Sequence, residues 1–197
     1  MRYPTEHKGE ARQRLLALIG GHAKQHGFND SGLAALAAAA GVTTGALYKH
    51  FDGKAGLFAA LITAEMARTA QMLDAIEPAD SAAVARFIAG YLGLAHVGHP
   101  EQGCPLPSLT PEVARADDAV RAAFQAGLLD VHARLQRLTA SPDDAWALMA
   151  QSVGAVMLAR ALPDEACQAE LLGALQRAGG QLLKVGRDNA CRENAGC

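Results

Sequence analysis

Six neighbouring residues have side chains, or the lack of one, suited to contact with nucleic acid. They supply two hydroxyls, a phenol, a cation and an imidazole around one glycine: Thr43, Thr44, Gly45, Tyr48, Lys49 and His50. Hydroxyl and imidazole groups can exchange hydrogen bonds with base edges, whereas lysine and tyrosine suit phosphate. The glycine keeps the segment narrow at its front end. Ser31 and Lys54, on either side of this segment, add a hydroxyl and a second cation that could contact the phosphate backbone of a nucleic acid.

The surrounding pattern predicts a helix that presents these groups at its N-terminus. One helix is expected over residues 33–40, with Ser31 as its cap and Gly41 as its C-terminal glycine. Only residues 41–43 separate it from a second short helix over 44–51, for which Thr43 is a suitable cap. Two short helices joined by such a turn are typical of a helix-turn-helix, whose second helix enters the major groove.

The apolar residues of the two short helices predict a small core behind them. Large side chains are expected to fill it, namely Leu36, Val42, Leu47 and Phe51. Ala37 and Ala40 are small where the helices must approach closely. A preceding helix over residues 8–26 completes the core with a stripe at helical spacing, made of Ala11, Leu15, Leu18, Ile19, His22 and Ala23.

The order of residues in this segment resembles the TetR family of bacterial transcriptional regulators. The matching positions lie within residues 10–58 and include Gly27-Phe28, Ser31, Leu36-Ala37, Ala39 to Thr43, Gly45, Leu47-Tyr48, Phe51, Lys54 and Leu57. The resemblance implies three N-terminal helices that bind DNA and about six more that dimerise and hold a small ligand. It places Thr43, Thr44, Gly45, Tyr48, Lys49, His50 and Lys54 on the DNA face. Thr44 departs from the family, where a lysine or arginine is frequent, so a base contact there is in question.

The whole chain of 197 residues is predicted to be all-α, with about nine helices in two domains. Residues 1–53 form the helix-turn-helix domain, and residues 54–197 form a larger effector-binding and dimerisation domain. A long helix is expected from residue 54 to about 76, then one over 81–97. Residues 98–111 are the least helical, and Thr110-Pro111 is expected to start a further helix. Strong helix starts at Ser141 and at Pro163-Asp164 precede the last two helices.

Charge is divided unevenly along the chain. Residues 1–58 hold seven Lys/Arg and four Asp/Glu, whereas residues 59–197 hold eleven and sixteen, although the whole chain has a net charge of only −2. A basic N-terminal unit joined to an acidic body indicates two functions in one chain. The four cysteines include no CxxC pair, and no apolar run could span a membrane. Because Met1 to Glu10 are polar and charged, this stretch is not expected to be a secretory signal. A reducing cytoplasm is therefore expected, without a membrane partner.

A small effector is expected to bind in the larger domain. The candidate contacts are aromatic, imidazole and thiol side chains: Phe87, Tyr91, His96, Cys104 and Phe124. His96, His99 and Cys104 have a spacing reminiscent of metal ligands, but no fourth ligand is near, and neither a metal nor a cofactor is expected. Two alternatives stay open for Cys104, a small buried hydrophobe or a thiol that senses oxidants or electrophiles.

The last two helices carry apolar residues on more than one face, which predicts a second packing partner. The residues expected at a homodimer interface are Trp146, Val153, Met157, Leu171, Leu175 and Leu182. A twofold axis there would direct two reading helices to successive major grooves, about 34–36 Å apart or a multiple of that.

The sequence therefore predicts a ligand-responsive, homodimeric repressor that binds a palindromic operator in double-stranded DNA. A helical interaction module without operator binding is the first alternative. An enzyme is the second, and it is disfavoured because the chain has no Gly-rich phosphate loop, GxSxG, HExxH or credible triad.

Overall fold

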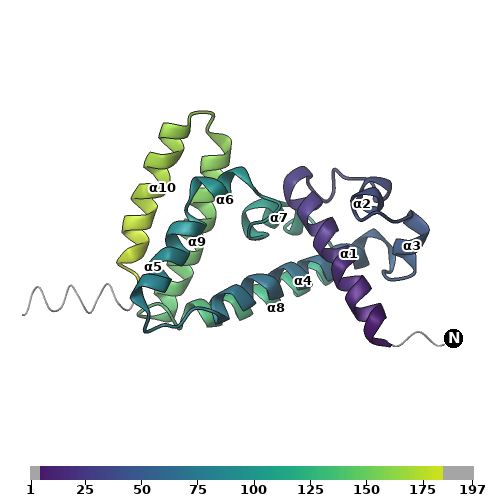
Figure 1. The fold of residues 1–197 in the computed structure, drawn as a ribbon, viewed down its shortest axis with the longest axis horizontal. Helices are drawn as coiled ribbons and strands as arrows, with labels where there is room; N and C mark the ends of the chain where they lie inside the picture. The colour runs from purple at the N-terminus through teal and green to yellow at the C-terminus, as the bar shows by residue number, and fades with distance from the viewer. Residues whose placement is uncertain (1–4, 184–197) are drawn as a thin grey trace, which may run out of the picture. The chain divides into compact units, whose positions relative to one another are not determined.

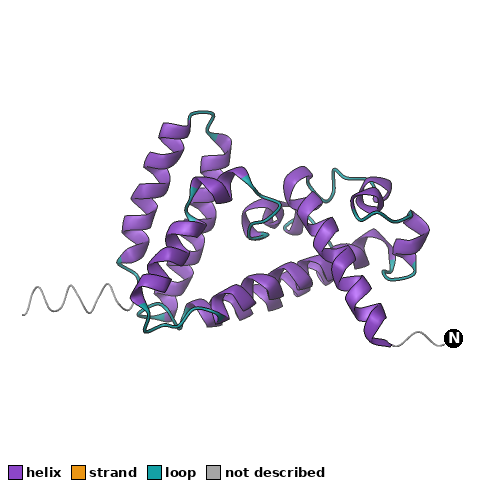
Figure 2. Cartoon of the chain, viewed as in Figure 1, coloured by secondary structure: helices purple, strands orange, loops and turns teal. Residues whose placement is uncertain are grey.

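A computed structural model describes residues 5–183, and helices joined by short loops make up this part of the chain (Figure 2). Its helices, labelled in Figure 1, are α1 (Thr5–His26), α2 (Leu33–Ala39), α3 (Thr44–Tyr48), α4 (Gly53–Asp74), α5 (Ser81–Tyr91), α6 (Leu94–Gly98), α7 (Leu106–Val113), α8 (Asp118–Leu135), α9 (Pro142–Ala161) and α10 (Glu165–Gly180). Within residues 5–183 no strand forms, and Thr139 and Leu183 make only an isolated bridge. The predicted all-α class is confirmed.

The described residues group into two compact units. The first contains the residues up to Thr69 together with Pro100–Leu128, and the second contains Ala70–His99 and the residues from Leu129 onward. The long helices α4 and α8 each supply residues to both units. This grouping reflects packing density, and the functional boundary after residue 53 stays a prediction.

In the first unit, α1 packs against α2 through a stripe that differs from the predicted one. Leu15, Leu16, Ile19 and Ala23 are buried, whereas Leu18 is 45% exposed and Ala11 also faces solvent. The prediction for Leu18 was therefore wrong. Leu16 and Leu18 lie at opposite edges of the helical stripe, and only the position of the packing partner decides which edge is covered.

The turn between α2 and α3 forms as the sequence indicates. Gly41 has a φ of +69°, a left-handed conformation that favours glycine. The N–H of Gly41 donates to Ala38 O and that of Val42 to Ala37 O, both at 3.0 Å, so the end of α2 is closed by backbone groups. Leu36, Ala37, Ala40, Leu47 and Phe51 are buried as predicted, and Val42 is half-buried.

The chain between residues 81 and 113 differs from the predicted helices. The helix expected over 81–97 is divided into α5 and α6 at Gly93, whose backbone is extended and caps α6. Helix α7 begins at Leu106 in the stretch expected to be least helical, and Pro111 lies inside it rather than at its start. Pro107 accounts for the earlier start because it falls in the first turn, where a missing N–H leaves no hydrogen bond unmade.

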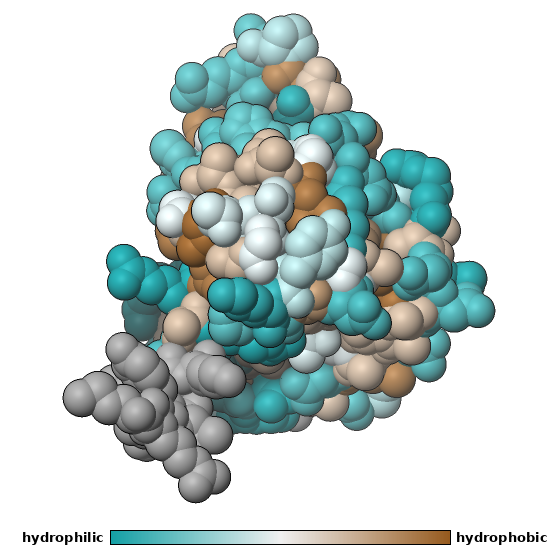
Figure 3. Space-filling view, turned by 90° about the vertical axis from the view of Figure 1, so that its right-hand side faces the viewer, coloured by the Kyte–Doolittle hydropathy of each residue, from teal (hydrophilic) through white to brown (hydrophobic). Residues whose placement is uncertain are grey.

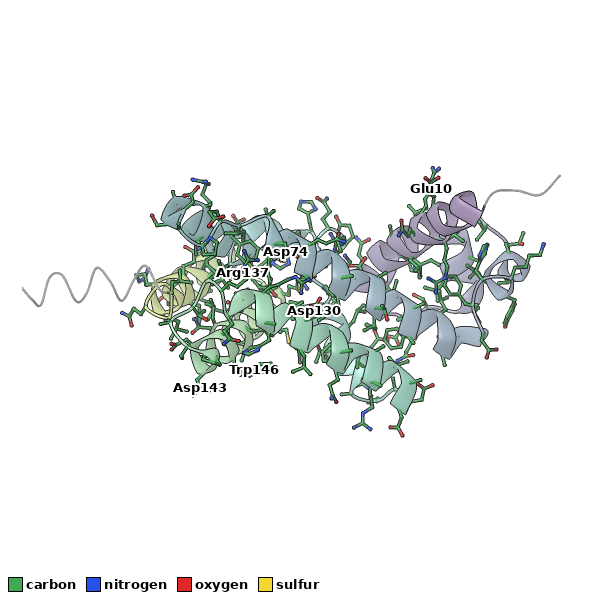
Figure 4. The ribbon with its side chains drawn as sticks, turned by 90° about the horizontal axis from the view of Figure 1, so that it is seen from below. Glu10, Asp74, Asp130, Arg137, Asp143 and Trp146 are labelled. Carbon is green, nitrogen blue, oxygen red and sulfur yellow. The ribbon has the colours of Figure 1, made fainter. Side chains whose placement is uncertain are left out.

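In the second unit, α9 and α10 lie side by side (Figure 1). Both begin where predicted, since Ser141 Oγ accepts from Asp144 N at 3.1 Å and Asp164 Oδ1 accepts from Cys167 N at 2.8 Å. Asp74, at the end of α4, accepts from Arg134 at 2.8 Å and from Arg137 at 3.1 Å (Figure 4). Both pairs lie at the surface, where solvent screening leaves them a small contribution to stability.

None of the helices within residues 5–183 is long and apolar enough to cross a membrane. The polar tail expected from Gly186 to Cys197 lies outside the described residues.

Candidate nucleic-acid interface

Helix α3 is held by two buried side chains and leaves the rest of its surface free for a ligand. Leu47 and Phe51 are 1% and 6% exposed, and α3 packs against α2. Thr43 Oγ1 accepts from Ala46 N at 3.3 Å, so the predicted cap is confirmed. The cap starts α3 directly after the turn. In the first turn of α3, Gly45 is exposed, whereas Thr44 and Ala46 are half-buried.

The predicted DNA contacts on this segment fall into two groups by exposure. Thr43, Gly45, Tyr48 and Lys49 are exposed, with Tyr48 at 60%, while Thr44 and His50 are half-buried. With 60% of its surface exposed, Tyr48 is not part of the core behind α3. The side of the molecule on the right of Figure 1 shows hydrophilic side chains around small apolar patches (Figure 3).

Lys54 is half-buried and already has protein partners. Its Nζ donates to Asn29 O at 3.0 Å and lies 5.4 Å from the centre of the Phe28 ring. Lys54 therefore connects the first turn of α4 to the turn between α1 and α2. An ammonium has three donors, so one bond to a carbonyl leaves others for a phosphate.

The prediction for Ser31 as a helix cap was wrong. The N-cap of α2 is Gly32, which has no side-chain cap bond. Ser31 is 6% exposed and its hydroxyl donates to Gly27 O at 2.7 Å, while His22 Nε2 lies 3.1 Å from the same Oγ. The hydroxyl thus closes the α1–α2 turn, a competing use of serine that sequence pattern alone does not distinguish from capping.

Arg12 is a cation that the sequence reasoning missed. It lies on the exposed part of α1 with its guanidinium 5.0 Å from the centre of the Phe51 ring, immediately after α3. This cation–π contact holds a positive charge beside the reading segment. The signal in the sequence was only a basic residue on a polar helix face, and its closeness to Phe51 depends on how α1 crosses α3.

The candidate effector contacts do not form one cluster within either unit. Phe87, Tyr91 and His96 adjoin one another in the second unit, with ring centres 6.5 Å and 4.6 Å apart, and His96 Nδ1 donates to Tyr91 O at 2.7 Å. Cys104 and Phe124 belong to the first unit. Cys104 is 3% exposed and lies 3.9 Å from the Thr69 hydroxyl. Burial favours the packing role for this thiol over the sensor role.

Phe124 lines a groove of about 410 Å³ in the first unit. Residues of α7 and α8 form its walls, namely Thr110, Val113, Ala114, Asp118, Arg121, Ala122, Phe124, Gln125 and Leu128. Thr110 Oγ1 is buried without a hydrogen-bond partner among the described residues. The groove thus combines apolar walls with the Arg121–Asp118 ion pair and with the buried Thr110 hydroxyl.

The predicted interface residues lie on α9 and α10, except Leu182, which follows the end of α10. Trp146 and Met157 are each 39% exposed, and Leu158, which the sequence reasoning did not single out, is 61% exposed. Val153, Leu171, Leu175 and Leu182 are half-buried. Trp146 also stacks on His132, with ring centres 4.0 Å apart and an angle of 16° between the planes.

Comparison with known proteins finds a family match in the N-terminal segment. Residues 23–61 match the family model described as bacterial regulatory proteins, tetR family. No curated protein matches the sequence at a significant level.

Solved structures of similar fold cover most of the chain. The regulatory protein TetR from Rhodobacter sphaeroides is 25% identical, with a TM-score of 0.70 over 88% of this chain and 98% of its own. The reduced form of E. coli NemR is 22% identical, with a TM-score of 0.72 over 88% and 97%. The regulator FadR from Bacillus subtilis, solved with stearoyl-CoA, is 15% identical, with a TM-score of 0.62 over 89% and 98%.

Proposed function

This chain belongs to the TetR family of bacterial regulatory proteins, and we propose that it is a homodimeric repressor released from a palindromic operator by a small-molecule effector. The observation that carries the proposal is helix α3. Leu47 and Phe51 are buried behind it, while Thr43, Tyr48 and Lys49 face solvent at its two ends. Such a helix presents hydrogen-bonding groups to base edges and a cation to the flanking phosphate.

A twofold dimer through α9 and α10 is the second part of the proposal. Trp146, Met157 and Leu158 expose large apolar surface on one helix, which a second copy would remove from water. Two reading helices on one dimer would raise the affinity for a palindrome well above that of either half alone.

Effector binding is the third part, and two places support it. The groove around Phe124 offers apolar walls, Arg121 and the Thr110 hydroxyl, which has no hydrogen-bond partner within residues 5–183. The cluster of Phe87, Tyr91 and His96 offers aromatic surface in the second unit. The B. subtilis FadR structure contains an acyl-CoA, which makes long apolar carboxylic acid derivatives reasonable first compounds to screen here. The effector acts through different affinities for the DNA-binding and released states.

Selection from random double-stranded DNA with the purified full chain tests the proposal. We expect enrichment of a palindrome whose half-sites are separated by whole helical turns, together with a dimeric mass in light scattering. A Tyr48→Ala, Lys49→Ala double variant is the control, and it should enrich nothing. Absence of any enriched sequence at low salt would instead favour an interaction module without operator binding. Binding rather than catalysis is the activity proposed, in the cytoplasm.

A further inference from the structure

We infer that Glu112 of α7 is a positioning residue that fixes the orientation of the helix pair α2 and α3, here called the reading head. The inference rests on the proposed DNA-binding function. Glu112 lies 84 residues from Phe28 in the chain and is 9% exposed. A buried carboxylate is unfavourable unless it is fully hydrogen-bonded, so its partners show what it holds.

Both carboxylate oxygens bind the turn that follows α1. Oε1 accepts from Phe28 N at 2.9 Å and Oε2 accepts from Asn29 N at 2.6 Å. Gly27, with a φ of +82°, turns the chain so that two successive N–H groups point to one place, which makes an anion-binding concavity. A Cβ at residue 27 would lie only 3.3 Å from Oε1, so glycine also provides the room for the carboxylate.

The same turn is bonded to a DNA-contact candidate on its other side. Asn29 donates its N–H to Glu112 Oε2, and its carbonyl oxygen accepts from Lys54 Nζ at 3.0 Å. The Phe28 ring lies under the Lys54 ammonium and stacks on Phe58 of α4, with ring centres 4.2 Å apart. A single residue, Asn29, therefore links the carboxylate of α7 to the cation predicted to bind phosphate.

The turn also determines where α2 begins. The Ser31 hydroxyl donates to Gly27 O at 2.7 Å, and the next residue, Gly32, is the N-cap of α2. A displacement of Glu112 would therefore reach both Lys54 and the helix pair that carries the reading segment. Thr110, Val113 and Ala114, on either side of Glu112 in the sequence, line the groove proposed for an effector. Any compound that shifts α7 would move this carboxylate, which gives effector binding a physical route to the reading head.

Replacement Glu112→Gln in the full chain tests the inference. Glutamine has nearly the same shape, but only one of its two terminal groups can accept, so one of the two N–H bonds is lost. We expect affinity for the selected operator to fall about tenfold or more, since bonds to a charged acceptor are the strong ones. Affinity for random DNA should fall by less than about threefold, because phosphate contacts tolerate many orientations of the head.

Glu77→Gln is the matched control, since Glu77 is exposed on the short connection after α4, and it should leave both affinities unchanged. Unchanged operator affinity in Glu112→Gln would overturn the inference. Equal losses on operator and random DNA, together with a lower melting temperature, would also overturn it, since they indicate general loss of structure. If the wild-type chain selects no DNA, the proposed function fails, and this result is distinct from either outcome of the variant.

Hydrogen exchange provides a second readout that does not depend on DNA. Its wild-type part also does not depend on whether a variant folds. In the wild-type chain the amides of Phe28 and Asn29 should exchange slowly, although both belong to a turn. In Glu112→Gln at least one of them should exchange faster, while the buried amide of Leu61 in α4 keeps its rate. Fast exchange of both turn amides in the folded wild-type chain would overturn the inference.

Discussion

Lys24 and Glu65 form an ion pair with 2.7 Å between Nζ and Oε2, and their side chains are only 1% and 5% exposed. Arg68 binds the same carboxylate oxygen at 2.9 Å. Lys24 and Arg68 also donate to Gly103 O at 2.9 and 2.8 Å. Burial lowers the pKa of Lys24 from its usual value, and Glu65 opposes this shift. One carboxylate therefore balances two cations where α1, α4 and the segment before α7 meet.

Replacement Glu65→Gln should destabilise the fold by about 3 kcal/mol, since it leaves a buried lysine without its counter-charge. Arg68 worsens the loss because it adds a second positive charge beside Lys24. Urea unfolding measures the change in the free energy of unfolding. Asp118→Asn is the matched control, since Asp118 is 99% exposed and pairs with Arg121 at the surface, and it should change stability by less than about 1 kcal/mol. Similar losses in the two variants would contradict the importance of the buried pair.

Stability should also fall on mild acidification, and His22 should account for part of the fall. Its pKa is lowered from the usual value of 6.5, first by burial and then by the charge of His26, whose ring centre is 4.6 Å away. Between the lowered pKa and 6.5 the unfolded chain binds a proton that the folded chain lacks. The free energy of unfolding therefore decreases as the pH falls through this window. Below the pKa of His22 in the folded state, both states carry the proton and His22 contributes no further decrease.

An NMR titration of the His22 ring checks the midpoint directly. The His22→Gln variant should show a flatter dependence of stability on pH below about 6.5. A midpoint at or above that of an unperturbed histidine would rule out this contribution.

Lys54→Ala should weaken binding to all DNA sequences alike and reduce the salt slope by roughly one unit. The reason is that its ammonium has donors left for a phosphate after its bond to Asn29 O. Binding measured at several salt concentrations, on the operator and on random DNA, gives both quantities. Loss of preference at particular bases, with an unchanged salt slope, would mean that Lys54 acts only through the turn at Asn29.

Thr44→Ala should alter the preferred base at one position of each half-site, since Thr44 is the first residue of α3 and its side chain is partly exposed there. Lost discrimination of about 1–3 kcal/mol is the usual size for a good base contact, and a single hydroxyl should be at the lower end. Repeating the selection with the variant measures the change. A uniform loss across all sequences would assign Thr44 to the phosphate backbone.

Met157→Glu should weaken the proposed dimer by about 100-fold or more, because two unpaired carboxylates would be buried at the twofold interface. Sedimentation across a range of concentrations measures the dissociation constant. Met72→Glu is a close control, since Met72 has the same side chain and is 42% exposed on α4, compared with 39% for Met157. A Met157→Glu chain that remains dimeric at the same concentrations would place the interface elsewhere.

Local signals in the sequence predicted the local structure well. Thr43 and Ser141 cap the helices expected of them, and Gly41 adopts the left-handed conformation that a helix stop requires. Each of these signals involves residues within about four positions of one another. Such residues are neighbours in space whatever the tertiary packing. Gly93 and Pro107 were harder to interpret because a break and an early start depend on how the neighbouring helices pack.

The polar contacts that fix the site could not be predicted in the same way. Lys24 meets Glu65 across 41 residues, and Glu112 meets Phe28 across 84. No periodicity links such pairs, and a lysine at the end of a helix is usually solvated. Arg12 and Phe51 are a further example, since their contact depends on the crossing of α1 and α3.

The bonds from Glu112 end on peptide N–H groups and not on side chains, which has a consequence for tolerance to substitution. Asn29 is exposed, so any residue except proline there would still offer the N–H that Glu112 binds and the carbonyl that Lys54 binds. Phe28 is different, because its ring is 1% exposed and stacked on Phe58. The identity of residue 29 can therefore change freely, for instance to adjust the charge near the DNA, without loosening the attachment of α7.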